Sequence, residues 1–161
     1  MSLVYLHLGS NIGDRILFLQ RASLYIEKKV GIVLDKSKIY ETSPWGNTQQ
    51  TDYLNQVVFA QTMLSAQELL ETILHIEQIM GRVRSIKWGS RKIDIDILFF
   101  NRDVISRKHL KVPHPLLHKR LFVLKPLVEI APNFIHPIYN KKISEILASC
   151  LDSEKVEEYA V

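Results

Sequence analysis

Two aspartates inside one hydrophobic run are the residues of this chain that most directly indicate chemistry. A single isoleucine separates Asp94 from Asp96 in the segment 93–100, whose β-branched and aromatic residues predict a strand. Side chains alternate along a strand, so both carboxylates should leave the same face. Two negative charges held this close repel each other unless a cation lies between them. Oxygen ligands suit Mg²⁺, which usually completes its shell with phosphate oxygens and water.

A basic segment directly before that strand supplies the opposite charge. It covers residues 82–92 and holds Trp88 and Gly89 between its cations. Arginine binds phosphate oxygens in a bidentate manner, and a tryptophan on a loop can help to close a site. Taken singly, the two features have simpler explanations, namely solvated acids on a half-exposed strand and a solvated basic loop. Taken together, they predict binding of a magnesium–nucleotide complex.

A loop rich in polar residues, proline and glycine leads into a further strand. The loop covers residues 42–50 and contains Trp45, and Tyr53 and Asn55 follow it closely. An aromatic ring together with an amide that offers both a donor and an acceptor suits a planar, hydrogen-bonding heterocycle. The simpler alternative is that Trp45 caps the core and Asn55 satisfies a strand end.

His114 differs from the other histidines because prolines at 113 and 115 restrict its backbone on both sides. The alternative is a rigid turn with an incidental histidine. Arg120 and Phe122 follow as a candidate anion clamp and a candidate stacking ring. The histidines show no His-Glu-x-x-His arrangement, which argues against zinc. The turn 9–14 has an acid, Asp14, where a phosphate loop needs a lysine, and we interpret it as the start of a helix.

The elements that must position these residues follow from the hydrophobic pattern. Strands are predicted over residues 3–8, 32–40 and 53–62, and helices over 16–26 and 66–80, with Ser65 and Glu68 forming a capping box. A final helix is expected over 143–151, followed by a loosely held acidic end at 152–158. The order strand, helix, strand, strand, helix, strand is that of a ferredoxin-like α/β sandwich of the α+β class. We expect a mixed, mainly antiparallel sheet with helices packed on one face.

Length and composition limit the class of protein. A chain of 161 residues with 47% hydrophobic and 24% charged residues predicts one globular domain. The net charge of +4 favours an anionic ligand but is too small to establish nucleic-acid binding. Cys150 is the only cysteine, which excludes an intrachain disulfide. No apolar run reaches the roughly 20 residues needed to cross a bilayer, and no leader pattern is present, so we expect a cytoplasmic location and no membrane partner.

These motifs resemble, over nearly the whole chain, the 6-hydroxymethyl-7,8-dihydropterin pyrophosphokinases of folate biosynthesis. The block that ends in Asp94 and Asp96 is the most specific part of the resemblance, whereas the stretch 9–11 alone would be weak. The matching stretches are 8–11, 42–46, 52–55, 81–84, 88–97, 112–115 and 126–132.

The resemblance implies a single ferredoxin-like pyrophosphokinase domain over residues 1–161. It implies an ATP-dependent diphosphotransferase, a kinase that moves the β,γ-diphosphoryl group of ATP onto the hydroxymethyl group of a reduced pterin and releases AMP. The partners implied are ATP and the pterin, with no nucleic acid, and we expect a monomer.

By the same resemblance, Asp94 and Asp96 hold a pair of Mg²⁺ ions, and Arg82 and Arg91 belong to a mobile catalytic loop. Tyr53 and Phe122 are expected to flank the pterin ring, and Asn55 to bond its edge. The full pterin set implied is Thr42, Pro44, Trp45, Tyr53, Asn55 and Phe122. The ATP set implied is Glu77, Arg84, Trp88, Arg91, Ile97, Lys111, His114 and Arg120.

Two other functions fit parts of the sequence. A ferredoxin-like RNA-binding module would also combine basic charge with exposed aromatic residues. However, the chain lacks the RNP1 pattern, and Asp94 and Asp96 would repel a phosphate backbone in the absence of metal. A metal-dependent nucleotide hydrolase would use water in place of the pterin hydroxyl.

Overall fold

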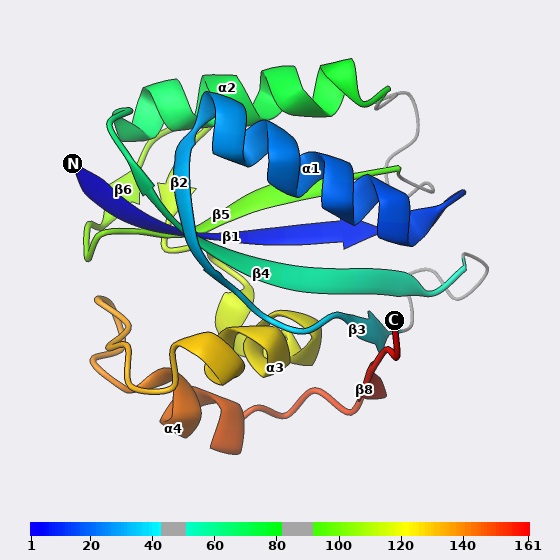
Figure 1. Cartoon of the computed structure of the whole chain (residues 1–161). Coiled ribbons are helices and arrows are strands. Elements are labelled where there is room, and N and C mark those ends of the chain that lie inside the picture. Colours follow the sequence, from blue (N-terminus) through cyan, green and yellow to red (C-terminus); the bar gives the residue numbers. More distant parts are fainter. Residues whose placement is uncertain (43–50, 82–91) are drawn as a thin grey trace.

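One antiparallel sheet organises the fold, and helices cover both of its faces (Figure 1). This computed structural model describes residues 1–42, 51–81 and 92–161. The strand order is β5-β1-β4-β3-β8, and β2 also pairs with β4. The strands of this sheet are β1 (Ser2–Ser10), β2 (Gly31–Lys36), β3 (Tyr40–Thr42), β4 (Tyr53–Thr62), β5 (Asp94–Phe100) and β8 (Val156–Glu158). A separate small sheet pairs β6 (Ile105–Ser106) with β7 (Lys111–Val112).

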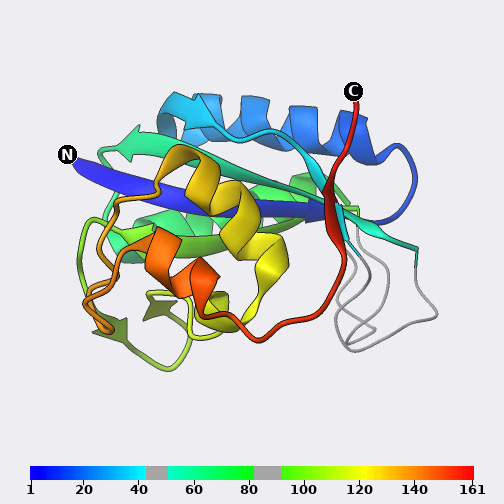
Figure 2. The ribbon, with the colours of Figure 1, turned by 90° about the horizontal axis from the view of Figure 1, so that it is seen from below.

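The helices form two layers, one on each side of the sheet (Figures 1 and 2). The helices α1 (Arg15–Lys29) and α2 (Ala66–Ile79) lie on one face. The helices α3 (Leu121–Ile130) and α4 (Ile143–Ala148) lie on the other, after a short 3₁₀ turn at Leu117–Lys119. With β2 and β3 sharing one side of β4, this is the predicted ferredoxin-like sandwich, extended by a second helical layer.

Two details of the predicted sheet were wrong. The predicted sheet was mixed, but all strand pairs in the described part of the chain are antiparallel. Strands β1 and β2 run in the same direction, but they do not pair with each other because β4 lies between them. The helices also cover both faces rather than one. The reason is that β1 and β5 carry large apolar side chains on both faces, and Tyr5 and Phe99 need a covering layer as much as Leu6 and Leu8 do.

Each face of the sheet has its own hydrophobic core. Leu6 and Leu8 of β1 pack with Leu19 of α1 and Ile73 of α2 on the first face. Tyr5 packs with residues of α3 and α4 on the second face. Fully burying one such aliphatic side chain contributes about 1.5–3 kcal/mol, so the two cores together hold both helical layers against the sheet.

Local capping agrees with the sequence. Asp14 caps α1 by accepting a hydrogen bond from the backbone N–H of Leu17, which confirms the turn 9–14 as a helix start. Ser65 and Glu68 form the predicted capping box at the start of α2.

Two predicted elements differ from the structure. The strand expected over residues 32–40 is divided into β2 and β3. At the break, the backbone N–H of Val57 donates its hydrogen bond to the hydroxyl of Ser37 instead of to a backbone carbonyl of the neighbouring strand. The acidic end expected to be loosely held instead forms β8, which pairs with β3 and buries Val156. Edge pairing uses backbone groups, so it needs little hydrophobic pattern in the sequence.

A substitution at Gly31 would test how closely β2 approaches β4. A Cβ atom on Gly31 would lie 1.9 Å from the backbone oxygen of Gln61. We expect Gly31→Ala to lower the free energy of unfolding by about 2–4 kcal/mol, because backbone atoms of β4 would have to move. Urea unfolding would measure the change. The control Gln61→Ala removes only a partly exposed side chain and should cost less than about 0.5 kcal/mol. Equal stability of the two variants would contradict the clash.

Candidate active site

Several of the side chains predicted for metal and ligand binding, among them Asp94, Asp96 and Asn55, lie on the sheet face that α3 and α4 cover, which we call the site face. Strand register places them in rows, because directly paired residues of antiparallel strands share a face. One row runs from Asp94 through Gly9 and Asn55 to Tyr40, across four strands. Next to it, Asp96 is paired with His7.

The two aspartates have the arrangement that the sequence predicted. Asp94 and Asp96 are half-buried, whereas Ile95 and Ile97 are buried and belong to the core under α1 and α2. The carboxylates therefore leave the site face together. The part of the chain that the structure describes contains no cluster of three or more His, Cys, Asp or Glu side chains suited to a metal ion.

Two residues of the implied ATP set lie on the other side of the sheet. Ile97 is buried in the core under α1 and α2. Glu77 of α2 is buried, and its carboxylate accepts the backbone N–H of Ile95 at 2.9 Å. This hydrogen bond joins α2 to β5 at Ile95, the residue between the two aspartates. Lys111 is exposed on β7.

Arg120 lies close enough to Asp96 to feel its charge, and Phe122 and His114 lie close to Arg120. The guanidinium carbon of Arg120 is 5.4 Å from the ring centroid of Phe122. Burial lowers the pKa of Arg120, and the negative charge of Asp96 opposes that shift. Burial, with a contribution from Arg120, lowers the pKa of His114 to about 4. His114 is therefore neutral at pH 7, and its Nδ1 accepts the N–H of Leu116 at 3.2 Å, so Nε2 carries the proton.

His7 was not among the predicted site residues, yet it lies in the middle of them. Its side chain is 4% exposed, its Nε2 is 3.1 Å from Oδ1 of Asn55, and its ring centroid is 5.5 Å from that of Phe122. Burial lowers the pKa of His7 to about 3, so the ring is neutral at pH 7. The sequence feature that could have indicated His7 is its position as a polar residue in the otherwise apolar strand 3–8.

Gly9 forms the floor between these side chains. A Cβ atom on Gly9 would lie 3.5 Å from Cε1 of His7, 3.5 Å from Cδ1 of Tyr53 and 3.8 Å from Oδ1 of Asn55. These are ordinary van der Waals distances. The backbone of Gly9 is therefore open toward the space that the three side chains surround.

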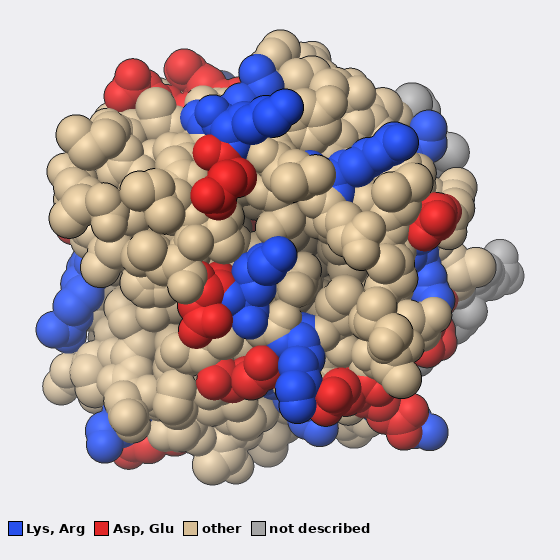
Figure 3. Space-filling view, viewed as in Figure 1, with Lys and Arg blue, Asp and Glu red and all other residues tan. Residues whose placement is uncertain are grey.

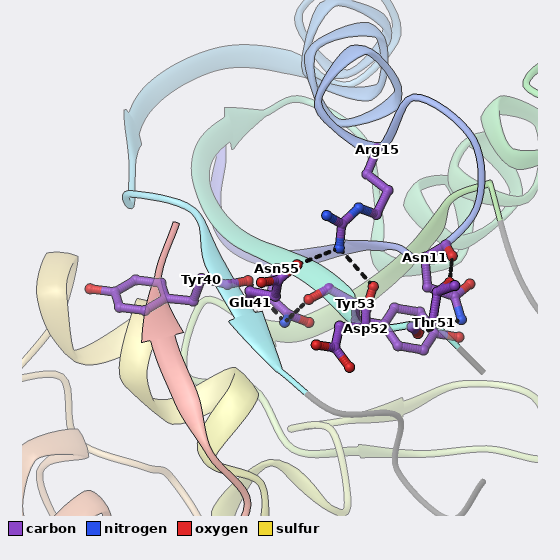
Figure 4. A network of polar contacts seen from close by, with 8 residues as sticks. All are labelled: Asn11, Arg15, Tyr40, Glu41, Thr51, Asp52, Tyr53 and Asn55. Carbon is purple, nitrogen blue, oxygen red and sulfur yellow. Dashed lines mark hydrogen bonds and ion pairs between the residues drawn. The ribbon is translucent and has the colours of Figure 1, made fainter. Parts of the chain in front are cut away.

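A polar network joins residues of β3 and of the stretch before β4 to Arg15 at the start of α1 and to Asn11 just before it (Figure 4). Nη1 of Arg15 donates to the carboxylate of Glu41 at 2.7 Å and to the backbone oxygen of Asp52 at 2.9 Å. Asn11 and Thr51 exchange hydrogen bonds between their side chains and backbone oxygens. These contacts fix β3 and the stretch before β4 relative to the start of α1.

Several predicted site residues lie outside the described residues. They are Pro44 and Trp45 of the implied pterin set and Arg82, Arg84, Trp88 and Arg91 of the implied catalytic and ATP sets.

Charge on the visible molecular surface is mixed. In Figure 3 the described lysine and arginine side chains are interspersed with aspartates and glutamates. None of the described helices combines the length and apolar character needed to cross a membrane.

Comparison with solved structures identifies the class of fold. A Plasmodium falciparum HPPK-DHPS structure matches with a TM-score of 0.77 at 20% sequence identity, covering 91% of this chain and 42% of that chain. Another HPPK-DHPS structure, in complex with substrates, matches with a TM-score of 0.77 at 17% identity, covering 92% of this chain and 43% of that one. The chain thus has the ferredoxin-like fold of those structures and spans less than half of their length.

Sequence comparison identifies the family. The model described as 7,8-dihydro-6-hydroxymethylpterin-pyrophosphokinase (HPPK) matches residues 5–132. Two relatives are named 2-amino-4-hydroxy-6-hydroxymethyldihydropteridine pyrophosphokinase. The one from Aquifex aeolicus is 49% identical over 146 residues, which is 90% of each chain. The one from Bacillus subtilis is 45% identical over 130 residues, 80% of this chain and 78% of the relative. The chain belongs to the HPPK family, as the motifs predicted.

Arg15 offers a test of the polar network. We expect Arg15→Ala to lower the free energy of unfolding by about 1–2 kcal/mol, because it removes a charged donor shared by Glu41 of β3 and Asp52, the residue before β4. Urea unfolding at low and high salt would show that part of the loss is screened. Arg21→Ala is the control, since Arg21 is an exposed arginine on the same helix. A loss no larger than that of the control would contradict the role of Arg15.

Proposed function

We propose that the site face is the active site at which this chain transfers the diphosphoryl group of ATP to 6-hydroxymethyl-7,8-dihydropterin, giving AMP and the pterin diphosphate. One observation carries the proposal. Four separate strands direct Asp94, Asp96, Asn55 and Thr42, together with Gly9, toward one face in a chain that belongs to the HPPK family. A magnesium–nucleotide pocket and a heterocycle pocket then lie side by side.

The heterocycle end is supported by the polar atoms that face it. The hydroxyl of Thr42 is buried and has no hydrogen-bond partner within the described parts of the chain. Thr42 is paired with Tyr53, so both lie on the site face. Oδ1 of Asn55 has two lone pairs and accepts from His7 with one of them. The other can accept an N–H of the pterin edge, while Tyr53 and Phe122 supply ring contacts.

The metal end is supported by the chemistry of its donors. Asp94 and Asp96 offer oxygen ligands only, and they are few. This fits Mg²⁺, which is commonly held by one or two carboxylates with phosphate oxygens and water in the remaining positions. Mg²⁺ bound there would neutralise phosphate charge and lower the pKa of a coordinated hydroxyl. We propose that the two aspartates hold the expected pair of ions.

The reaction requires little covalent chemistry from the protein. The pterin hydroxyl oxygen forms a bond to the β-phosphorus, and the bond between that phosphorus and the oxygen of AMP breaks. The hydroxyl proton leaves, with Asp96 as the proposed acceptor. Arg120 and the Nε2–H of His114 would donate to phosphate oxygens. Orientation and charge neutralisation therefore account for most of the expected acceleration.

The remaining implied contacts stay part of this proposal. Arg82 and Arg91 would close on the transferring group, with Arg84, Trp88 and Lys111 completing the ATP contacts and Pro44 and Trp45 the pterin set. Glu77 and Ile97 of the implied ATP set lie on the opposite side of the sheet, so their proposed part is to support β5 from behind the site face. The single domain, the monomeric state and the cytoplasmic location also stay predictions.

The most direct test of the function is calorimetry with the reduced pterin, with and without a nonhydrolysable ATP analogue and Mg²⁺. We expect the analogue and Mg²⁺ to strengthen pterin binding, because both ligands share the site face. Formation of AMP without added pterin would indicate a hydrolase. Binding of short RNA without either ligand would favour the RNA-binding alternative.

Asp94→Asn and Asp96→Asn test the metal role. Each variant keeps the side-chain volume and removes a charged ligand, so we expect turnover to fall by about 100-fold or more and the Mg²⁺ requirement to rise. An AMP assay across a Mg²⁺ titration would measure both effects. Asp103→Asn is the control, because Asp103 is exposed and lies on the turn after β5. Turnover of either site variant close to that of the control would refute the assignment.

Gly9→Ala separates ligand binding from folding. The added methyl group meets its neighbours at ordinary distances, so we expect the free energy of unfolding to change by less than about 0.5 kcal/mol. It occupies the floor of the pterin pocket, and we expect the dissociation constant of the pterin to rise about tenfold with that of the ATP analogue unchanged. Calorimetry would measure both constants. Unchanged pterin affinity would show that the ligand does not approach Gly9.

A further inference from the structure

His7 is buried at the centre of the site face, and the proposed reaction assigns it no role. It lies on the central strand β1, paired with Val57 of β4 on one side and Asp96 of β5 on the other. Its imidazole touches two of the residues proposed to hold the pterin, Asn55 and Phe122. Nε2 contacts Asn55, and the ring meets Phe122 edge to face at an interplanar angle of 63°.

The surroundings of Asn55 fix the direction of the bond between the two side chains. Nδ2 of Asn55 donates to the backbone oxygen of Tyr40 at 3.2 Å and to that of Tyr53 at 3.4 Å (Figure 4). A flipped amide would turn Oδ1 toward both of these carbonyl oxygens, which is unfavourable. Oδ1 therefore faces His7. Since Oδ1 can only accept, Nε2 of His7 must carry the proton and donate.

This arrangement gives the imidazole a specific task. Asn55 presents an acceptor to the pocket only while its Nδ2 faces the two carbonyl groups, and the donor from His7 stabilises that orientation. Without the hydrogen bond from His7, Oδ1 of Asn55 would lose a donor while it stays buried, and a buried acceptor without a donor raises the free energy of the folded protein.

We propose that His7 is a positioning residue for pterin recognition, acting through Asn55. The inference rests on the proposed function, because it assumes that Asn55 bonds the pterin edge. His7 itself need not touch the reacting atoms. It holds the acceptor in place before the ligand arrives, so that binding does not have to reorient the amide.

His7→Phe tests the bond while keeping a ring of similar size. We expect the dissociation constant of 6-hydroxymethyl-7,8-dihydropterin, measured with saturating ATP analogue and Mg²⁺, to rise about tenfold. The dissociation constant of the ATP analogue should change less than about twofold. His7→Gln, which places an amide N–H near the position of Nε2, should recover most of the lost affinity.

His136→Phe is the matched control. His136 is also a buried histidine, 1% exposed, and its ring also packs against a phenylalanine, Phe99, at a centroid distance of 5.4 Å. Its Nδ1 accepts backbone N–H groups of Ile138 and Tyr139, so the variant loses hydrogen bonds as well. We expect His136→Phe to lower stability but to leave pterin affinity within about twofold. Equal pterin affinities of the two variants would reduce His7 to a packing role and overturn the proposal.

Two further measurements make the proposal independent of any single variant. In the double variant His7→Phe/Asn55→Ala, the loss of pterin affinity should be no greater than in Asn55→Ala alone, because His7 acts through Asn55. Additive losses would overturn the proposal.

In the unmodified protein, ¹⁵N NMR of the His7 ring should show the proton on Nε2, and a proton on Nδ1 would also overturn the proposal. If the unmodified protein does not bind the pterin at all, the proposed function fails instead.

Discussion

Strand β1 pairs with β4 along its whole length and with β5 from Val4 to Gly9, and this double pairing fixes which side chains meet on the site face. Asp94, Gly9 and Asn55 come from distant parts of the sequence and share one row only because of that register. A shift of one residue in either pairing would turn the side chains of that strand to the opposite face. Large apolar residues on both faces of β1 oppose such a shift, because it would move Leu6 and Leu8 out of the core under α1 and α2.

The same register divides the site face into a dry part and a polar part. Tyr5 and Phe99 lie in the aromatic and aliphatic core beneath α3 and α4. Further along β1, the residues on this face are His7 and Gly9 instead. The imidazole of His7 is hydrogen-bonded to Asn55 there, and the low local dielectric of a buried site strengthens such a bond. A rigid core thus directly adjoins the groups proposed to bind ligand.

The parts of the structure that could be predicted are those determined by local pattern. The alternation around Asp96 gave the correct face of β5, and Ser65 and Glu68 gave the correct start of α2, because each depends on residues within a few positions. Contacts between distant segments could not be read in this way. The bond between Arg15 and Glu41 depends on where the start of α1 lies relative to β3, and the division of β2 from β3 depends on the contact between the hydroxyl of Ser37 and the backbone N–H of Val57. His7 was missed for the same reason, since its partner Asn55 is 48 residues away.

Strand β8 closes the outer edge of β3, the short strand that carries Tyr40 and Thr42. An open edge of this kind presents unpaired N–H and C=O groups and can recruit a strand from a neighbouring molecule. Residues 156–158 therefore shield the strand that contributes Thr42 to the proposed pterin pocket. Proteolytic clipping before Val156 would expose β3 to self-association, so the integrity of the carboxyl-terminal segment bears on aggregation as well as on the shape of the pocket.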